Sequence, residues 1–324
     1  MIIKPLKPTL ELLQIEALNM RLPQKHIRKE EVSLKSRNLR AGYNGELSLQ
    51  FPLSFLPENK YFIFHNLRMK DPQGAFQIDI LLISAHFLLI IEVKNIWKHV
   101  IFDEMGQAYR IIDDEIEQGF TNPVNQVKLQ YLRLRRWLKK HPFPSLPIEK
   151  VVVYSNPGTI LKNLTKRNEL PKIVMHKDKL LDKIDEFSHR HTHAGLSEEQ
   201  RLELSHQLLS AHTEKKVDIL SEYHVTYEQL IKGVICPDCF NAPMHRKGGK
   251  WLCSNCGSTS KTAHKTALAH YALLFNNYIN NRQAREFLQL ESSNVTKQLL
   301  QKEKLKHFGT KSGRKYVLDV EVLI

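Results

Sequence analysis

Cysteines are few in this chain and long apolar runs are missing, and both absences limit what the protein can be. The 324 residues include only four Cys, all between Cys236 and Cys256. A secreted domain held by disulfides would spread its cysteines through the fold, so that class is excluded. No run approaches the roughly 18 apolar residues of a membrane span, and prolines interrupt MIIKPLKPTL where a signal peptide needs an apolar helix. We expect a cytoplasmic protein with no membrane partner.

Acidic residues are also scarce relative to basic ones. The sequence has 34 Asp and Glu against 48 Lys and Arg, which gives a formal net charge of +14. This excess favours a polyanionic partner, either nucleic acid or an anionic surface, although net charge also serves solubility. With 42% hydrophobic residues, the chain can bury a substantial core and is long enough for two or three domains.

Helical and strand-like patterns alternate through the first half of the chain. Apolar spacing predicts helices over 9–22, with Thr9 as N-cap, and over 124–140, opened by Asn122-Pro123. The basic segment 25–40 is interpreted as a linker or as the entry to the next domain, and residues 42–51 can be read as a helix. Strands are predicted at 61–67, 78–83, 87–91, 97–102, 107–112 and 151–154. This order is typical of an α/β domain.

The segment 76–95, FQIDILLISAHFLLIIEVKN, combines two buried-strand patterns with four polar residues. If Ser84 and Phe87 close a two-residue hairpin, Asp79 faces Glu92 and Gln77 faces Lys94, all on one face. Ala85-His86 is not a favoured tight-turn pair, so the register could also be shifted by one residue. The polar side chains would still gather at one end of the hairpin.

Asp79 and Glu92 on neighbouring strands would repel each other unless a divalent cation neutralises them. Lys94 would place an ammonium beside that ion, where it can orient an attacking water and stabilise charge on a phosphate oxygen. The pattern Asp, Glu-x-Lys therefore indicates phosphodiester hydrolysis. The alternative is a salt bridge at the end of a hairpin.

These motifs resemble the nuclease-related domain, NERD, a branch of the PD-(D/E)xK nuclease superfamily. The matching residues are Gly42-Tyr43-Asn44-Gly45-Glu46, Gln77-Ile78-Asp79, Glu92-Val93-Lys94, and Asn122-Pro123 with Gln126, within about residues 37–154. The resemblance implies a restriction-endonuclease-like α/β fold, with a mixed sheet flanked by helices. It also implies that Asp79 and Glu92 hold Mg²⁺ or Mn²⁺, that Glu46 adds a carboxylate, that Lys94 assists the nucleophile, and that Gln126 orients groups near the site.

The four cysteines form two C-x-x-C pairs, Cys236 with Cys239 and Cys253 with Cys256. This spacing predicts one structural Zn²⁺ held by four thiolates in a zinc ribbon that depends on metal for folding. A thioredoxin-like redox pair is the alternative, but it needs only a single C-x-x-C.

Two predicted helices and a basic hairpin follow the cysteines. Residues 281–290 and 293–305 read as helices joined by a turn, and 307–318 reads as a hairpin; together they resemble a winged helix-turn-helix. A small helical bundle used for oligomerisation is the alternative. The predicted nucleic-acid contacts are Asn294, Thr296, Lys297 and Gln298 on the second helix, Lys311, Arg314 and Lys315 on the hairpin, and Lys128, Arg133, Arg135 and Arg136 on the helix over 124–140.

The sequence as a whole predicts five parts. They are an N-terminal helix and linker (1–36), the NERD-like domain (37–190), a helical linker (191–230), the zinc ribbon (231–262) and the winged-helix-like domain (263–324). The predicted function is a metal-dependent nuclease acting on nucleic acid, most readily DNA, with RNA as a further substrate class. The alternative is a DNA-binding regulator or repair scaffold that does not cut.

Overall fold

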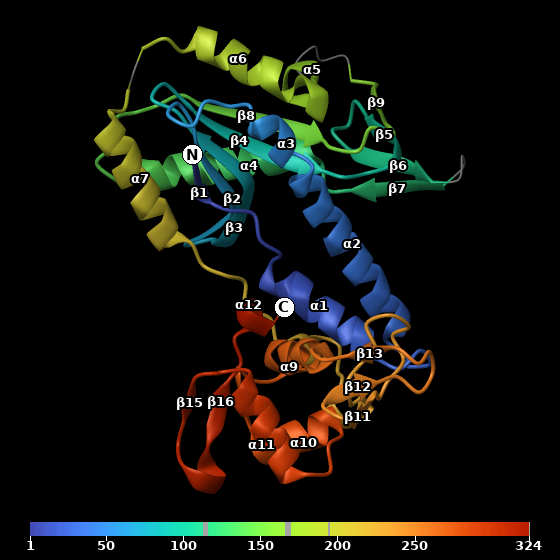
Figure 1. Cartoon of the computed structure of the whole chain (residues 1–324). Helices are drawn as coiled ribbons and strands as arrows, with labels where there is room; N and C mark the ends of the chain where they lie inside the picture. The colour runs from blue at the N-terminus through green and yellow to red at the C-terminus, as the bar shows by residue number, and fades with distance from the viewer. Residues whose placement is uncertain (113–115, 166–169, 194, 324) are drawn as a thin grey trace. The chain divides into compact units, whose positions relative to one another are not determined.

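The chain forms two compact units in the computed structural model, which describes residues 1–112, 116–165, 170–193 and 195–323 (Figure 1). Unit 1 contains residues 1–8 and 39–214, and unit 2 contains residues 9–38 and 215–324. The finer division into five parts stays a prediction. None of the helices in the described ranges is long and apolar enough to cross a membrane.

A six-stranded mixed sheet is the centre of unit 1. Its strand order is β1 (Ile2–Lys4), β2 (Phe62–Asp71), β3 (Gly74–Ile83), β4 (Leu88–Lys94), β8 (Ile148–Tyr154) and β10 (Val174–His176). Strands β2, β3 and β4 are antiparallel, whereas β1, β8 and β10 pair in parallel. The predicted mixed α/β sheet is confirmed.

Helices cover both faces of this sheet (Figure 1). On one face, α4 (Pro123–Leu138) and α7 (Glu198–Ala211) pack into a core with Leu81 and Ile90. On the other face, α3 (Gln50–Leu53) and α6 (Leu180–Arg190) pack into a second core. Strand β4 is therefore buried on both faces, which explains its continuous apolar run LLII.

A second sheet of unit 1 begins soon after β4 ends. Its order is β7 (Ile116–Phe120), β6 (Ala108–Ile112), β5 (Lys98–Phe102) and β9 (Thr159–Asn163). The predicted strands at 97–102 and 107–112 are confirmed, and the turn between them is closed by Gly106 donating to Asp103. Helix α5 (Leu170–Ile173) precedes β10.

Unit 2 combines helices with two small sheets. Its elements include α1 (Leu10–Arg21), α8 (Ile219–Glu222), α9 (Ala263–Leu274), α10 (Asn281–Leu288), α11 (Ser293–Lys302) and α12 (Val320–Leu323). One sheet contains β11 (His245–Lys247), β12 (Lys250–Leu252) and β13 (Thr259–Ser260), and the other has the order β14 (Tyr278–Asn280), β16 (Lys315–Val317), β15 (His307–Phe308). Thr9 caps α1 as predicted.

The prediction of a linker over 25–40 is wrong, because most of this segment belongs to helix α2 (Lys29–Leu47). Val32 is fully buried, and Lys35 forms an ion pair with Glu11 at 3.4 Å. Tertiary contacts therefore stabilise the highly charged first part of this helix, whereas the segment that begins at Gly42 was predicted to be helical.

Candidate functional site

The β3–β4 hairpin has the register predicted from the sequence. Ile80 pairs with Ile91, and Ile83 pairs with Leu88. The unfavourable turn pair is supported by Ser84, whose Oγ accepts hydrogen bonds from the N–H groups of His86 (3.1 Å) and Phe87 (2.9 Å). A side-chain turn of this kind replaces the usual Asn-Gly chemistry and fixes the register.

The backbone pairing of β3 with β4 ends at Ile80 and Ile91. At the next position, the Asp79 carboxylate replaces the backbone carbonyl as the hydrogen-bond acceptor. Its Oδ2 accepts a hydrogen bond of 2.9 Å from the Val93 N–H. Here the strand also changes phase, because Ile78 belongs to the same core as Leu81 while Ile80 belongs to the opposite core. The prediction that Gln77 shares the face of Glu92 is therefore wrong.

Gln77 instead connects the hairpin to strand β2. It is exposed, and its side-chain amide donates to Asn66 Oδ1 at 2.8 Å. Asn66 has a left-handed φ of 51°, which an Asn tolerates better than most residues. The side-chain amide of Asn66 also lowers the pKa of Glu46, although other effects on Glu46 are larger.

Glu92 is the buried centre of the polar cluster, with 1% of its surface exposed. Its Oε1 accepts from Lys94 Nζ at 2.6 Å, and its Oε2 accepts from Gln130 Nε2 at 2.6 Å. Lys94 Nζ also donates to Gln126 Oε1 at 3.1 Å. Helix α4 thus contributes Gln126 and Gln130, one turn apart, to the cluster formed by β4.

The carboxyl groups of Asp79 and Glu46 lie close enough to Glu92 to feel its negative charge. Burial, together with the charges of Glu92 and Glu46, raises the pKa of Asp79 well above its ordinary value. Burial and the charge of Glu92 raise the pKa of Glu46 to about 8. Glu46 Oε2 is buried without a hydrogen-bond partner. Burial and neighbouring carboxylates thus raise the pKa values of both Asp79 and Glu46 beside Glu92.

Gly45 brings the last turn of α2 close to the end of β4. A Cβ at this position would lie 2.7 Å from Asn95 Cβ and 2.9 Å from Ser155 Oγ. Asn95 Nδ2 donates to the carbonyl of Ala41 at 2.8 Å. This close approach, which requires glycine, places Glu46 beside the β4 carboxylate.

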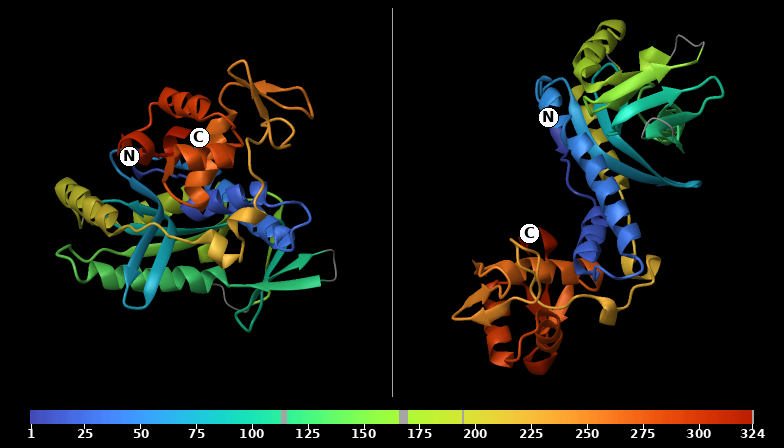
Figure 2. Two further views of the ribbon diagram at one scale, coloured as in Figure 1. Left: turned by 90° about the horizontal axis from the view of Figure 1, so that it is seen from below. Right: turned by 90° about the vertical axis from the view of Figure 1, so that its right-hand side faces the viewer.

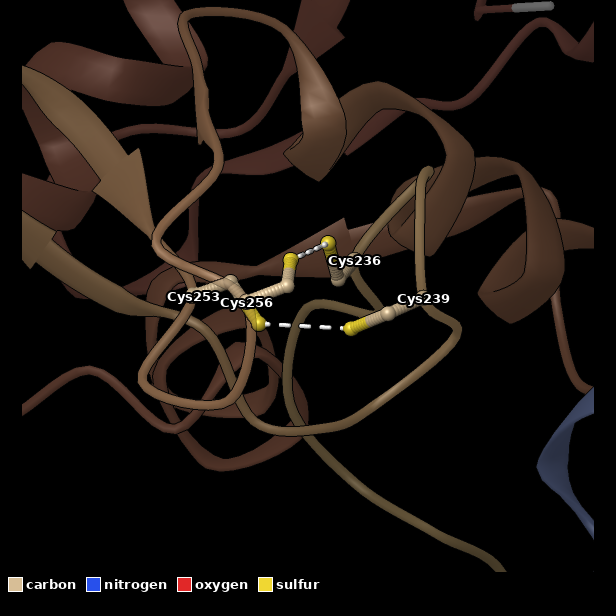
Figure 3. A group of neighbouring side chains, drawn as sticks. All are labelled: Cys236, Cys239, Cys253 and Cys256. Carbon is tan, nitrogen blue, oxygen red and sulfur yellow. Dashed lines mark hydrogen bonds between the residues drawn. The ribbon is translucent and has the colours of Figure 1, made fainter.

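The four cysteines converge on one point (Figure 3). Sγ of Cys236 lies 3.7 Å from Sγ of Cys256, and Sγ of Cys239 lies 3.5 Å from Sγ of Cys253. A disulfide would need about 2.05 Å, whereas a tetrahedron with Zn–S bonds of about 2.3 Å has edges near 3.8 Å. The cysteines are positioned to bind one metal ion, and in the described part of the chain they are the one group of three or more Cys, His, Asp or Glu ligand atoms within 4.8 Å of one another.

Both cysteine pairs lie on turns with the same hydrogen bonds. Phe240 N–H donates to Cys236 O, and Gly257 N–H donates to Cys253 O, each at 3.0 Å. Phe240 and Gly257 both have left-handed φ, at 59° and 73°. The Asn255 amide lies 3.5 Å from Cys239 Sγ and lowers the pKa of this thiol to about 6. The arrangement fits a zinc ribbon.

The basic residues of α4 that were predicted to contact nucleic acid differ in their exposure and in their hydrogen-bond partners. Lys128, Arg135 and Arg136 are exposed, and Arg136 donates to Gln73 Oε1 at 2.7 Å. Arg133 instead forms a forked pair with Asp71 and also donates to the carbonyls of the β2–β3 turn. Figure 2, in its left view, shows this teal hairpin beside the green α4. The guanidinium of Arg133 therefore holds the β2–β3 turn against α4, and it is not available to contact nucleic acid.

The predicted contacts on α11 also differ in exposure. Asn294, Lys297 and Gln298 are exposed, as predicted for a surface helix. Thr296 is fully buried, and its hydroxyl donates to the Ser292 carbonyl at 3.0 Å, so it cannot reach a base. On the hairpin, Lys311 is exposed, Arg314 is half-buried, and Lys315 Nζ lies 4.5 Å from the centre of the Tyr278 ring.

Sequence reasoning missed two residues of the cluster, Gln130 and Asn66. Gln130 is nearly buried and donates to Gln77 O at 3.0 Å as well as to Glu92. Its position four residues after Gln126, on the apolar side of α4, was the available signal. Asn66 is buried in strand β2 beside His65, and a buried polar residue indicates a specific partner.

Comparison with protein families found one family whose model matches the segment that contains the carboxylate cluster. Residues 41–155 match the family described as nuclease-related domain, NERD, and this range contains every residue of the cluster. No curated protein and no solved structure matched the chain. The carboxylate cluster therefore lies in a segment that is similar to the nuclease-related domain family.

Proposed function

We propose that unit 1 hydrolyses phosphodiester bonds of nucleic acid at the cluster of Glu46, Asp79, Glu92 and Lys94. The observation that carries the proposal is that two further carboxyls, Glu46 and Asp79, lie around the buried Glu92, with Lys94 in direct contact. A structural salt bridge needs only one carboxylate per cation. The additional carboxyls indicate a site built for more positive charge than Lys94 supplies.

The donor set suits a hard divalent cation. Asp79 and Glu92 would hold Mg²⁺ or Mn²⁺, and the partnerless Oε2 of Glu46 offers a further oxygen. Such an ion, when bound, would polarise the phosphate and a water molecule. Glu46, Asp79 and Lys94 are half-buried, and Mg²⁺ usually retains several water ligands when bound to protein.

Lys94 is placed to act on the attacking water and the phosphate. Its ammonium is held between Glu92 Oε1 and Gln126 Oε1, and its side chain is 22% exposed. From this position it can orient the water and stabilise charge developing on a phosphate oxygen. Gln126 and Gln130 fix the orientations of Lys94 and Glu92.

Unit 2 would bind the nucleic acid. The four cysteines would hold one Zn²⁺, whose role is structural because all four positions are occupied by protein. Helices α10 and α11 with the β15–β16 hairpin follow the order of a winged helix-turn-helix, with Asn294, Lys297 and Gln298 available for the major groove. Helix α11, with Gln298, and the ribbon hairpin line a groove of about 600 Å³ that also includes Arg246 and Lys302.

The test is cleavage of labelled single-stranded, duplex and branched DNA and of RNA with Mg²⁺ or Mn²⁺. We expect cleavage by the wild type and its loss in Asp79→Asn, Glu92→Gln and Lys94→Met, each nearly isosteric with the native residue. Glu186→Gln, on the exposed side of α6, is the matched control and should retain activity.

Two results would contradict the proposal. Equal activity in all three variants would place the chemistry elsewhere. Binding of nucleic acid without cleavage of any substrate would favour the scaffold function. Affinity should also fall steeply with salt, as counterion release requires.

A further inference from the structure

An exposed tryptophan lies just beyond the proposed catalytic strand. Trp97 is 63% exposed, and it follows Lys94 by three residues, so the two Cα atoms are at most about 11 Å apart. Single exposed aromatic side chains are common on protein surfaces, so what distinguishes Trp97 is its position three residues after Lys94. Its place beside the cluster suggests a ligand that also reaches Lys94.

The backbone around Trp97 is fixed. Thr159 Oγ1 donates to the Ile96 carbonyl at 2.6 Å. Lys98 has a left-handed φ of 69°, which a residue with a Cβ adopts only at some cost. Lys98 then pairs with Thr159 at the start of the β5–β9 ladder. Trp97 thus lies in a hydrogen-bonded connection between the two sheets.

Gly158 supports one edge of the indole. A Cβ at Gly158 would lie 2.8 Å from both Cδ1 and Nε1 of Trp97, so the glycine lets the ring rest against the backbone. These atoms belong to the five-membered ring, and 63% of the residue surface is exposed. Lys98 Nζ lies 5.3 Å from the ring centre, close enough for a cation–π contact.

We propose that Trp97 stacks on an unpaired nucleobase and that the substrate of the neighbouring site is single-stranded nucleic acid, or a strand with an unpaired segment. This inference rests on the proposed function for the position of the phosphate. An aromatic face beside cations is the usual platform for single strands, because every base has a π face and the backbone is anionic. Paired bases in a duplex have both faces covered by their neighbours.

The test is equilibrium binding of the full chain to oligonucleotides that carry the fluorescent base 2-aminopurine, without added Mg²⁺ or Mn²⁺. Single-stranded DNA, single-stranded RNA and a duplex of the same sequence form the three arms. The wild type should quench 2-aminopurine in a single strand. Trp97→Ala should remove the quenching and weaken single-strand affinity roughly 5- to 150-fold, with duplex affinity unchanged.

Three further variants separate stacking from general damage. Trp97→Phe should keep much of the quenching, and Gly158→Ala should reduce it because the added Cβ displaces the indole. Phe51→Ala removes another exposed aromatic side chain of unit 1, 74% exposed, and should change nothing.

The outcomes are distinguishable from those of the proposed function. Equal losses for single strand and duplex in Trp97→Ala, no loss for either, or no binding of any strand would overturn the stacking proposal. Quenching that depends on Trp97, without cleavage under Mg²⁺ or Mn²⁺, would leave stacking in place and contradict only the hydrolysis. If Trp97→Ala cleaves single strands as well as the wild type does, the hydrolysis would be supported and the stacking proposal would be contradicted.

Discussion

Replacing Arg133 should destabilise unit 1 without weakening nucleic-acid binding by the folded protein. Its guanidinium forms a fork with Asp71, in which the Nε to Oδ2 distance is 2.6 Å, and the two side chains are only 11% and 13% exposed. It also donates to the carbonyls of Gly74 (3.0 Å) and Ala75 (3.1 Å), and it lies 4.6 Å from the centre of the Phe76 ring. Arg133→Met keeps the apolar stem and removes all of the hydrogen bonds.

The expected loss is about 2–4 kcal/mol, since charge-assisted hydrogen bonds contribute about 1.5–3 kcal/mol each but do not add fully. For a unit of this size that corresponds to a fall of roughly 5–15 °C in Tm. Urea and thermal unfolding of Arg133→Met, Asp71→Asn and the double variant would measure the coupling between the two side chains. Arg135→Met, which is exposed, is the control.

The stabilisation that the Arg133–Asp71 pair provides should decrease at low pH. Arg133 holds the pKa of Asp71 below its ordinary value of 3.8, so the stabilisation is complete above that pH and is lost as pH falls through the folded-state pKa. The difference between wild type and Arg133→Met should therefore shrink below about pH 4. A variant as stable as the wild type at pH 7, with weaker binding of nucleic acid, would refute this interpretation.

Three other predictions concern the metal centre, a buried histidine and a helix glycine. Metal analysis should find about one zinc per chain, Cys239→Ser should lose it, and chelation should lower the melting temperature of unit 2; zinc-free protein of unchanged stability would contradict the ribbon. Burial, with a smaller effect of Arg21, lowers the pKa of His270 from 6.5 to about 3, so its neutral form stabilises unit 2 above pH 6.5 and this is lost on acidification. Between pH 7 and pH 5 the wild type should lose about 2 kcal/mol that His270→Leu does not lose, measured by urea unfolding. Gly45→Ala should reduce cleavage because its Cβ meets Asn95, whereas Gly42→Ala, with nothing within 4 Å, should be neutral or stabilising; equal activity in both would remove Gly45 from site positioning.

Local chemistry allowed much of the nuclease-related domain to be predicted. The β3–β4 register follows from two apolar runs and a two-residue turn, and α4 begins at Asn122-Pro123, where the Asn122 side chain accepts from Val124 N–H. The cysteine spacing likewise placed the metal centre. Each of these depends on residues that are close in sequence.

Features that depend on tertiary contacts were not predicted. The phase change at Asp79, which separates Gln77 from Glu92, occurs opposite the left-handed Asn66 on another strand. The structural role of Arg133 depends on Asp71, 62 residues away. Periodicity in one helix cannot distinguish an arginine that pairs with a half-buried carboxylate, such as Arg133, from an exposed arginine such as Arg135.

Calorimetric titration of Mn²⁺ into zinc-loaded protein tests the central claim most directly. Burial and neighbouring charge raise the pKa of Asp79 and bring that of Glu46 to about 8, so both carboxyls hold protons more tightly than they would unfolded. Metal binding must displace these protons, and affinity should rise as pH increases toward 8. We predict one Mn²⁺ site that releases protons and is lost in Asp79→Asn and Glu92→Gln. Absence of Mn²⁺ binding, or binding that both variants retain, would contradict the assignment of these carboxylates as a divalent-metal site.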